Sequence, residues 1–87
     1  MFIKTKKGII YNADKFVKIC IVENPYRDGV SFTEYWLIGA FDKDINRHEN
    51  YVILEQGDSK SFMDQQLSRI ETALYDNKNF IDLDYEY

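Results

Sequence analysis

The sequence predicts an α+β fold in which a twisted antiparallel β-meander of about five strands carries one amphipathic helix on one face. Three observations predict this architecture. Apolar residues alternate with polar residues through much of the chain before Asp58, as they do in strands. Turn-forming residues separate these runs, and after Asp58 the apolar spacing becomes that of a helix. The sequence has no linker or internal repeat, so residues 1–87 are expected to form a single domain.

Three strands are expected at the beginning of the chain. The first is FIKTK, residues 2–6, which ends at a Lys-Gly turn, and the second is IIY, residues 9–11. The third is FVKICIVE, residues 16–23. Because both of its faces are mostly apolar, the third strand is predicted to be central in the sheet.

The next two strands are expected to form an antiparallel hairpin. They are FTEYWLIGAF, residues 32–41, and YVILE, residues 51–55, with a polar connection of about nine residues between them. FIDL, residues 80–83, is a possible last strand.

One amphipathic helix is expected after Asp58. Its apolar stripe has the spacing of four, three and four residues that places side chains on one helical face: Met63, Leu67, Ile70 and Leu74. Ser59 or Ser61 can cap its first turn through a side-chain oxygen. Asn77 or Asn79 can end it in a left-handed conformation. We expect this helix to pack across the sheet through the stripe.

The order of these patterns resembles a group of known proteins. FIKTKKGIIYNAD, an apolar strand, EYWLIGAF, YVIL and a serine-started helix containing LSRIETAL follow one another along most of the chain. This arrangement is similar to small uncharacterised β-meander-plus-helix proteins of low-GC Gram-positive bacteria and their mobile elements. The resemblance implies an α+β fold and a cytoplasmic origin, and it implies no activity.

Composition and charge exclude several classes of protein. One cysteine, Cys20, cannot form an internal disulfide, and no apolar run is long enough for a signal peptide or a membrane span, so a cytoplasmic location is expected. The net charge is −4. Residues 1–22 carry five lysines against one aspartate, whereas residues 23–87 carry fourteen acidic and six basic side chains. Direct nucleic-acid binding is disfavoured because phosphate contacts need an excess of cations.

The segment FDKDINRHEN, residues 41–50, begins like a calcium-binding loop. Asp42, Asp44 and Asn46 provide oxygen ligands at alternate positions. The loop pattern then requires a glycine and a late bidentate glutamate, but these positions hold Arg47 and Ile53. We therefore interpret the segment as the polar tip of a hairpin, with a metal or ligand site as the alternative.

Other catalytic or metal chemistry has little support in the sequence. A transition-metal site would add His48 and Glu49 to the loop carboxylates, but zinc sites usually need several His and Cys ligands, and the chain has one of each. Cys20 lies in an apolar strand, where we expect a buried thiol. The four glycines are isolated, so no phosphate-binding loop is present. A non-enzymatic protein without a cofactor is predicted, and a small hydrolase is the less favoured alternative.

A protein-interaction surface is the remaining prediction. Tyrosine combines apolar area with a polar tip and is common in protein contacts, although Tyr51 and Tyr75 are predicted to lie in the core. The predicted contact residues come from the hairpin loop, an upstream turn and the end of the sequence: Asp42, Asp44, Glu49, Tyr26, Asp82, Asp84, Tyr85 and Tyr87.

The sequence thus predicts a small acidic interaction module whose protein partner has a basic surface. One version of this hypothesis is an inhibitor that occupies the nucleic-acid-binding surface of a host protein by charge mimicry. The alternative is a metal- or ligand-binding domain that uses the loop at residues 42–50. Homodimerisation is compatible with both, and with the small hydrolase as well.

Overall fold

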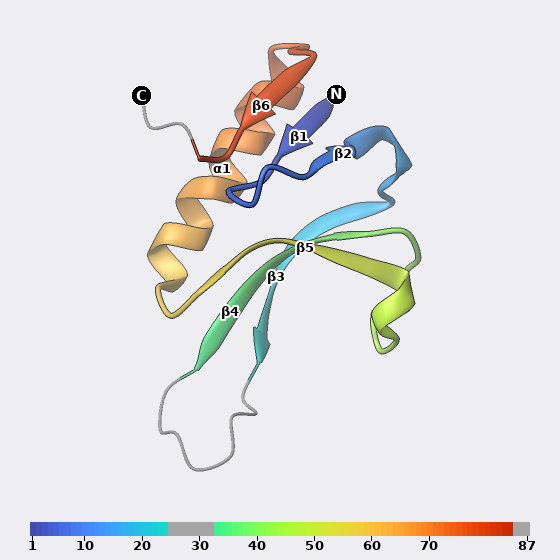
Figure 1. Ribbon diagram of the computed structural model, residues 1–87, viewed down its shortest axis with the longest axis vertical. Coiled ribbons are helices and arrows are strands. Elements are labelled where there is room, and N and C mark those ends of the chain that lie inside the picture. Colours follow the sequence, from blue (N-terminus) through green and yellow to red (C-terminus); the bar gives the residue numbers. More distant parts are fainter. Residues whose placement is uncertain (25–32, 85–87) are drawn as a thin grey trace.

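The computed structural model describes residues 1–24 and 33–84 (Figure 1). Within these residues the chain forms strands, two short 3-10 helices (η) and an α-helix. In chain order they are β1 (Phe2–Lys4), β2 (Ile10–Asn12), η1 (Ala13–Lys15), β3 (Lys18–Asn24), β4 (Glu34–Ala40), η2 (His48–Asn50), β5 (Tyr51–Gly57), α1 (Lys60–Tyr75) and β6 (Phe80–Asp82).

The strands form two sheets of three strands each among the described residues. Sheet A has the order β2-β1-β6, and sheet B has the order β3-β4-β5. Both pairs in sheet B are antiparallel, and so is the β1–β2 pair, but β6 runs parallel to β1. The helix α1 contacts β3, β4 and β5 of sheet B and β6 of sheet A (Figure 1).

The predicted α+β fold with one helix packed against a sheet is confirmed. The strand arrangement differs from a five-strand meander, because the chain leaves sheet A after β2, builds sheet B and returns to sheet A with β6. Phe2 pairs with Phe80 in this return. Pairing between segments so distant in sequence depends on packing around the shared core and leaves no local pattern.

The β1–β2 hairpin forms at the predicted Lys-Gly turn. The Thr5 N–H donates to Ile9 O at 2.9 Å, and Gly8 N–H donates to Thr5 O at 2.9 Å. Gly8 has a φ of 82°, which glycine adopts without a steric penalty. These two hydrogen bonds therefore close the turn of a hairpin that spans residues 2–12.

The predicted central position of the strand at residues 16–23 is wrong. This strand, β3, lies at the edge of sheet B, and β4 lies in the centre. Leu37, Ile38 and Ala40 of β4 are fully buried, whereas Val17 precedes β3 and is 58% exposed. Phe16 also precedes β3 and packs over Gly39. The apolar residues at the start of the predicted strand therefore belong to a turn that covers the sheet.

The helix begins and ends as its sequence predicts. The Ser59 side chain accepts a hydrogen bond from Phe62 N–H at 3.2 Å, so Ser59 is the cap. Asn77 follows the helix with a φ of 55°, in the left-handed region. The stripe is confirmed except at its end, since Leu74 is 49% exposed.

Both sheets and the helix share one hydrophobic core. Its buried members are Ile3, Ala13, Leu37, Leu54, Met63, Ile70, Ala73, Ile81 and Leu83. Strand β5 reaches this core through a β-bulge: Leu37 pairs with Glu55 and Ile38 pairs with Ile53, which leaves Leu54 without a partner in the register. The bulge changes the alternation, so that the adjacent residues Leu54 and Glu55 are both buried.

Candidate functional site

The loop carboxylates of residues 42–46 bind the loop's own backbone. Asp42 Oδ1 accepts from Asp44 N–H at 2.9 Å, and Asp44 Oδ1 accepts from Asn46 N–H at 3.0 Å. These are the local turns that Asp side chains commonly form with the backbone two residues ahead. The two carboxylates therefore shape the loop.

The other polar residues of the loop also contact near neighbours. His48 Nδ1 lies 3.0 Å from the Tyr51 hydroxyl, and Arg47 pairs with Glu49 at 3.3 Å. Cys20 is half-buried in β3. Among residues 1–24 and 33–84, no group of three or more His, Cys, Asp or Glu side chains is placed to hold a metal ion.

The other predicted contact residues lie away from the loop or outside the described residues. Asp82 Oδ1 accepts from Asp84 N–H at 2.9 Å, and its other oxygen is 4.0 Å from Lys4 Nζ. Strand β6 lies near the top of Figure 1 and the β4–β5 loop lies at its right-hand edge, so the two segments are apart. The predicted contacts Tyr26, Tyr85 and Tyr87 lie outside the described residues.

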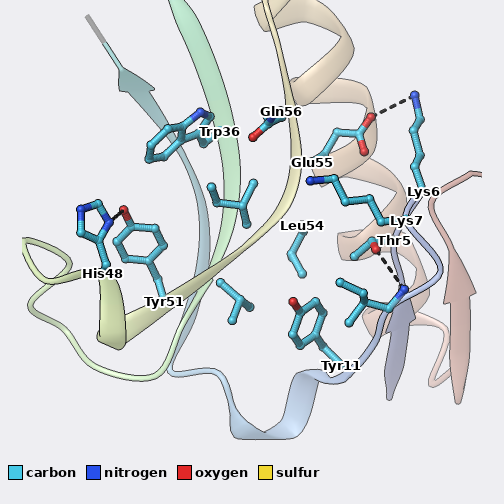
Figure 2. A pocket seen from close by; sticks show the side chains of 13 residues that line it. Thr5, Lys6, Lys7, Tyr11, Trp36, His48, Tyr51, Leu54, Glu55 and Gln56 are labelled. Atoms are coloured by element: carbon cyan, nitrogen blue, oxygen red, sulfur yellow. Dashed lines mark hydrogen bonds and ion pairs between the residues drawn. The ribbon is translucent and has the colours of Figure 1, made fainter. Parts of the chain in front are cut away.

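A groove between β5 and the β1–β2 hairpin has more of the properties of a binding site than the β4–β5 loop has. Its volume is about 530 Å³, within the range typical of ligand pockets. It is lined by residues 51–56 of β5, residues 5–7, 9 and 11 of the hairpin, and two further side chains, Trp36 and His48. We call this hollow the β5 groove (Figure 2).

Three aromatic rings from three strands surround the β5 groove. Trp36 and Tyr51 lie on one side of β5, and Tyr11 lies on the other (Figure 2). The Trp36 and Tyr51 ring centroids are 6.5 Å apart. Trp36 Nε1–H donates to Glu34 Oε1 at 2.6 Å, and the Tyr51 hydroxyl contacts His48, so the polar tips of both rings are held. Their positions are fixed before any partner arrives.

Two lysines lie at the hairpin end of the groove, and one of them is paired with a carboxylate. Glu55 is buried, and its Oε1 lies 3.0 Å from Lys6 Nζ. The Lys6 ammonium also lies 4.7 Å from the centroid of the Phe62 ring. Lys7 lines the same groove and is exposed, and within the described residues it makes no ion pair. The pair neutralises Glu55, so Lys7 is the groove's uncompensated charge.

A second hollow, of about 550 Å³, lies between α1 and β6. The helix provides most of its lining, and Phe80 is its one aromatic residue. It therefore offers less aromatic area for a partner than the β5 groove.

Sequence reasoning identified one residue of the β5 groove, His48, and for a different role. Tyr51 was expected in the core and is half-buried, with one side on the groove. Tyr75, also expected in the core, is 88% exposed, which makes that prediction wrong. Lys6 and Lys7 at the Lys-Gly turn were the sequence signal that could have indicated the groove. Only the folded chain, however, places that turn beside β5.

Comparison of the chain with protein-family models, with curated proteins and with solved structures gave no significant match. The resemblance to small proteins of low-GC Gram-positive bacteria therefore stays a prediction. Within the described residues, no helix is both long and apolar enough to cross a membrane.

Proposed function

We propose that this chain is a non-enzymatic protein-interaction module whose contact surface is the β5 groove. The observation that carries the proposal is the set of aromatic rings, Tyr11, Trp36 and Tyr51, that three different strands bring around one hollow. Tyrosine and tryptophan are enriched at protein interfaces because they provide a large contact area at a small entropic cost.

The fixed positions of the rings support this function. A surface that is already ordered loses less conformational entropy on binding than a mobile one. Trp36 and Tyr51 are tied at their polar tips by Glu34 and His48, so a partner would meet rings that are already in place. Their apolar faces then supply the contact area.

The β5 groove supports this function better than the hairpin loop does. The Asp42 and Asp44 carboxylates already accept backbone hydrogen bonds, and Glu49 already pairs with Arg47. A partner at the loop would have to compete with these contacts or add to them. Charge mimicry of nucleic acid by the acidic residues stays a prediction, and no contact among the described residues specifically favours it.

Two adjacent isoleucines provide a matched test. Ile9 and Ile10 are both exposed, at 47% and 56%, but only Ile9 lines the groove. Threonine keeps the β-branch and removes apolar area, so Ile9→Thr and Ile10→Thr should disturb the fold to a similar degree. Random twelve-residue peptides displayed on phage would be selected on the wild-type protein and then measured on both variants.

We expect the selected peptides to bind Ile10→Thr as they bind the wild-type protein. Ile9→Thr should weaken them by about fivefold, which corresponds to about 1 kcal/mol of lost apolar contact. The proposal is wrong if selection returns no binder above background, or if the selected peptides bind Ile9→Thr and wild type equally.

A further inference from the structure

We infer that the β5 groove takes an extended peptide segment that pairs antiparallel with the outer edge of β5. The segment carries an acidic side chain toward its N-terminal end, and this side chain meets Lys7. The inference rests on the proposed function and adds the conformation, the direction and the charge of the partner.

The lining of the groove points to the strand edge. Residues 51–56 of β5 all line it. Residues 51–53 alternate between the two faces of the strand, and Leu54 and Glu55 are both buried at the bulge. Because the hollow contacts side chains from both faces of β5, it follows the edge of the strand. Within the described part of the chain, β5 pairs with β4 only. Its other edge therefore presents backbone N–H and C=O groups to the groove, and an added strand would satisfy them.

The two sides of the groove match the two faces of an extended peptide. Trp36 and Tyr51 lie on one side of β5, and Tyr11 and Lys7 lie on the other (Figure 2). The side chains of an added strand alternate between the same two sides. Apolar side chains of one set would pack on Trp36 and Tyr51. The other set would contact Tyr11 and the Lys7 ammonium.

The charges determine which residue is favoured beside Lys7. Lys6 is already paired with the buried Glu55, so Lys7 remains for a partner. The whole chain has a net charge of −4, which repels an acidic peptide. A carboxylate placed beside Lys7, however, gains a local ion pair. The acidic side chain is therefore specific to one position in the groove.

The direction follows from the position of Lys7 along β5. Lys7 lies beside Glu55, toward the C-terminal end of the strand (Figure 2). Both strand pairs of sheet B are antiparallel. A peptide that continues this pattern places its N-terminal part opposite the end of β5. Its acidic residue must then precede the apolar residues that reach the aromatic rings.

A second copy of this chain that pairs through its own β5 is a poorer occupant of the groove. Pairing of two β5 strands would bring in a segment whose acidic side chain, Glu55, is buried and paired with Lys6. That carboxylate cannot reach Lys7 of the other copy without leaving the core. A second β5 would therefore leave the Lys7 charge without a partner.

Trp36 is the one tryptophan of the chain and lines the groove, so its fluorescence reports binding directly. The probe is a capped eight-residue peptide with glutamate at its second position, followed by alternating valine and threonine. Two control peptides replace the glutamate with glutamine or reverse the order of the residues. Each is titrated against wild type, Lys7→Gln and Lys15→Gln. Lys15 is an exposed lysine of η1 that does not line the groove, so both variants remove one positive charge.

We expect wild type and Lys15→Gln to bind the glutamate peptide about fivefold more tightly than the glutamine peptide. Lys7→Gln should bind these two peptides equally. The reversed peptide should bind wild type no more tightly than the glutamine peptide does. The inference is overturned if the glutamate gives no preference, or if Lys15→Gln abolishes the preference as Lys7→Gln does. It is also overturned if peptides selected by phage display bind at the groove and the glutamate probe does not.

These failures are distinguishable from a failure of the proposed function. If selected peptides bind without a role for Lys7, the interaction module stands and the acidic antiparallel partner is wrong. If no peptide changes Trp36 fluorescence and none is selected, the interaction module is wrong as well.

Sedimentation at two concentrations tests whether a second copy of the chain occupies the groove. A dimer that Ile9→Thr dissociates and Ile10→Thr preserves would assign the β5 edge to self-association and overturn the inference.

Discussion

Replacement of Gly39 by alanine tests how the aromatic residues next to the groove are packed. The new Cβ would lie 2.7 Å from Phe16 Cδ2 and nearer still to Cε2 and Cζ, so the ring must move. Its centroid lies 6.3 Å from that of Tyr11, which lines the β5 groove, and 5.3 Å from that of Phe41. Movement of the Phe16 ring therefore disturbs two aromatic contacts.

The expected magnitude combines opposing terms. Alanine in a strand gains roughly 0.5–1 kcal/mol over glycine from backbone entropy. Overpacking costs about 1–3 kcal/mol, and each disturbed aromatic pair is worth about 0.5–1.5 kcal/mol. With two aromatic pairs disturbed, we therefore expect Gly39→Ala to lower the free energy of unfolding by about 1–5 kcal/mol. For a domain of this size, that is a substantial part of a total of roughly 4–13 kcal/mol.

Urea unfolding monitored by circular dichroism measures this loss, and Gly57→Ala is the matched control. At Gly57 the added Cβ would meet only the terminal methyl of Met63, at 3.3 Å, which can move at little cost. That variant should stay within about 1 kcal/mol of wild type. In a Phe16→Leu background the cost of Gly39→Ala should fall by about 1 kcal/mol or more. The reasoning is refuted if both glycine variants have the same stability, or if Phe16→Leu leaves the cost unchanged.

Three further predictions concern an ion pair, a helix cap and the hairpin loop. Lys6→Met should lower the free energy of unfolding by about 1–3 kcal/mol, because it leaves the buried Glu55 carboxylate unpaired; thermal unfolding at neutral pH measures this, and an unchanged midpoint would contradict it. Ser59→Ala should cost about 1 kcal/mol and Ser61→Ala less, since Ser59 caps α1; equal losses in urea unfolding would argue against the cap. Asp44→Asn should leave the melting temperature unchanged with or without added calcium, because an amide oxygen can accept the same backbone hydrogen bond. If calcium raises the melting temperature of the wild type but not that of the variant, the loop is a metal site.

The helix illustrates how far a periodic pattern predicts packing. Leu74 has the spacing of the apolar stripe and is nevertheless 49% exposed, whereas the polar side chain of Gln66 is buried. The Gln66 Nε2 amide donates to Leu83 O at 2.9 Å, and Arg69 Nη2 donates to Asp82 O at 2.9 Å. These two side chains satisfy carbonyls at the end of sheet A. A sequence pattern cannot rank Gln66 above Leu74, because the carbonyls come from a strand whose position depends on the whole fold.

The candidate site was harder to predict than the fold. The acidic loop was the most site-like motif in the sequence, but its Asp42 and Asp44 carboxylates bind the loop backbone. Apart from His48, the β5 groove draws its residues from the hairpin, β4 and β5, and none of these three segments contains a recognisable motif. Lys7, Trp36 and Tyr51 become neighbours of one hollow only after both sheets have formed.

The sequence by itself determined the features that depend on a few neighbouring residues. These include the α+β class, the helix with a serine cap at Ser59 or Ser61 and a left-handed end at Asn77 or Asn79, and the antiparallel hairpin of β4 and β5; the structure selects Ser59 and Asn77. Only the tertiary structure decided the parallel pairing of Phe2 with Phe80, the bulge at Leu54 and the groove beside it. Capping and periodicity act over one or two turns of chain, whereas these contacts join distant segments and form only when the shared core is complete.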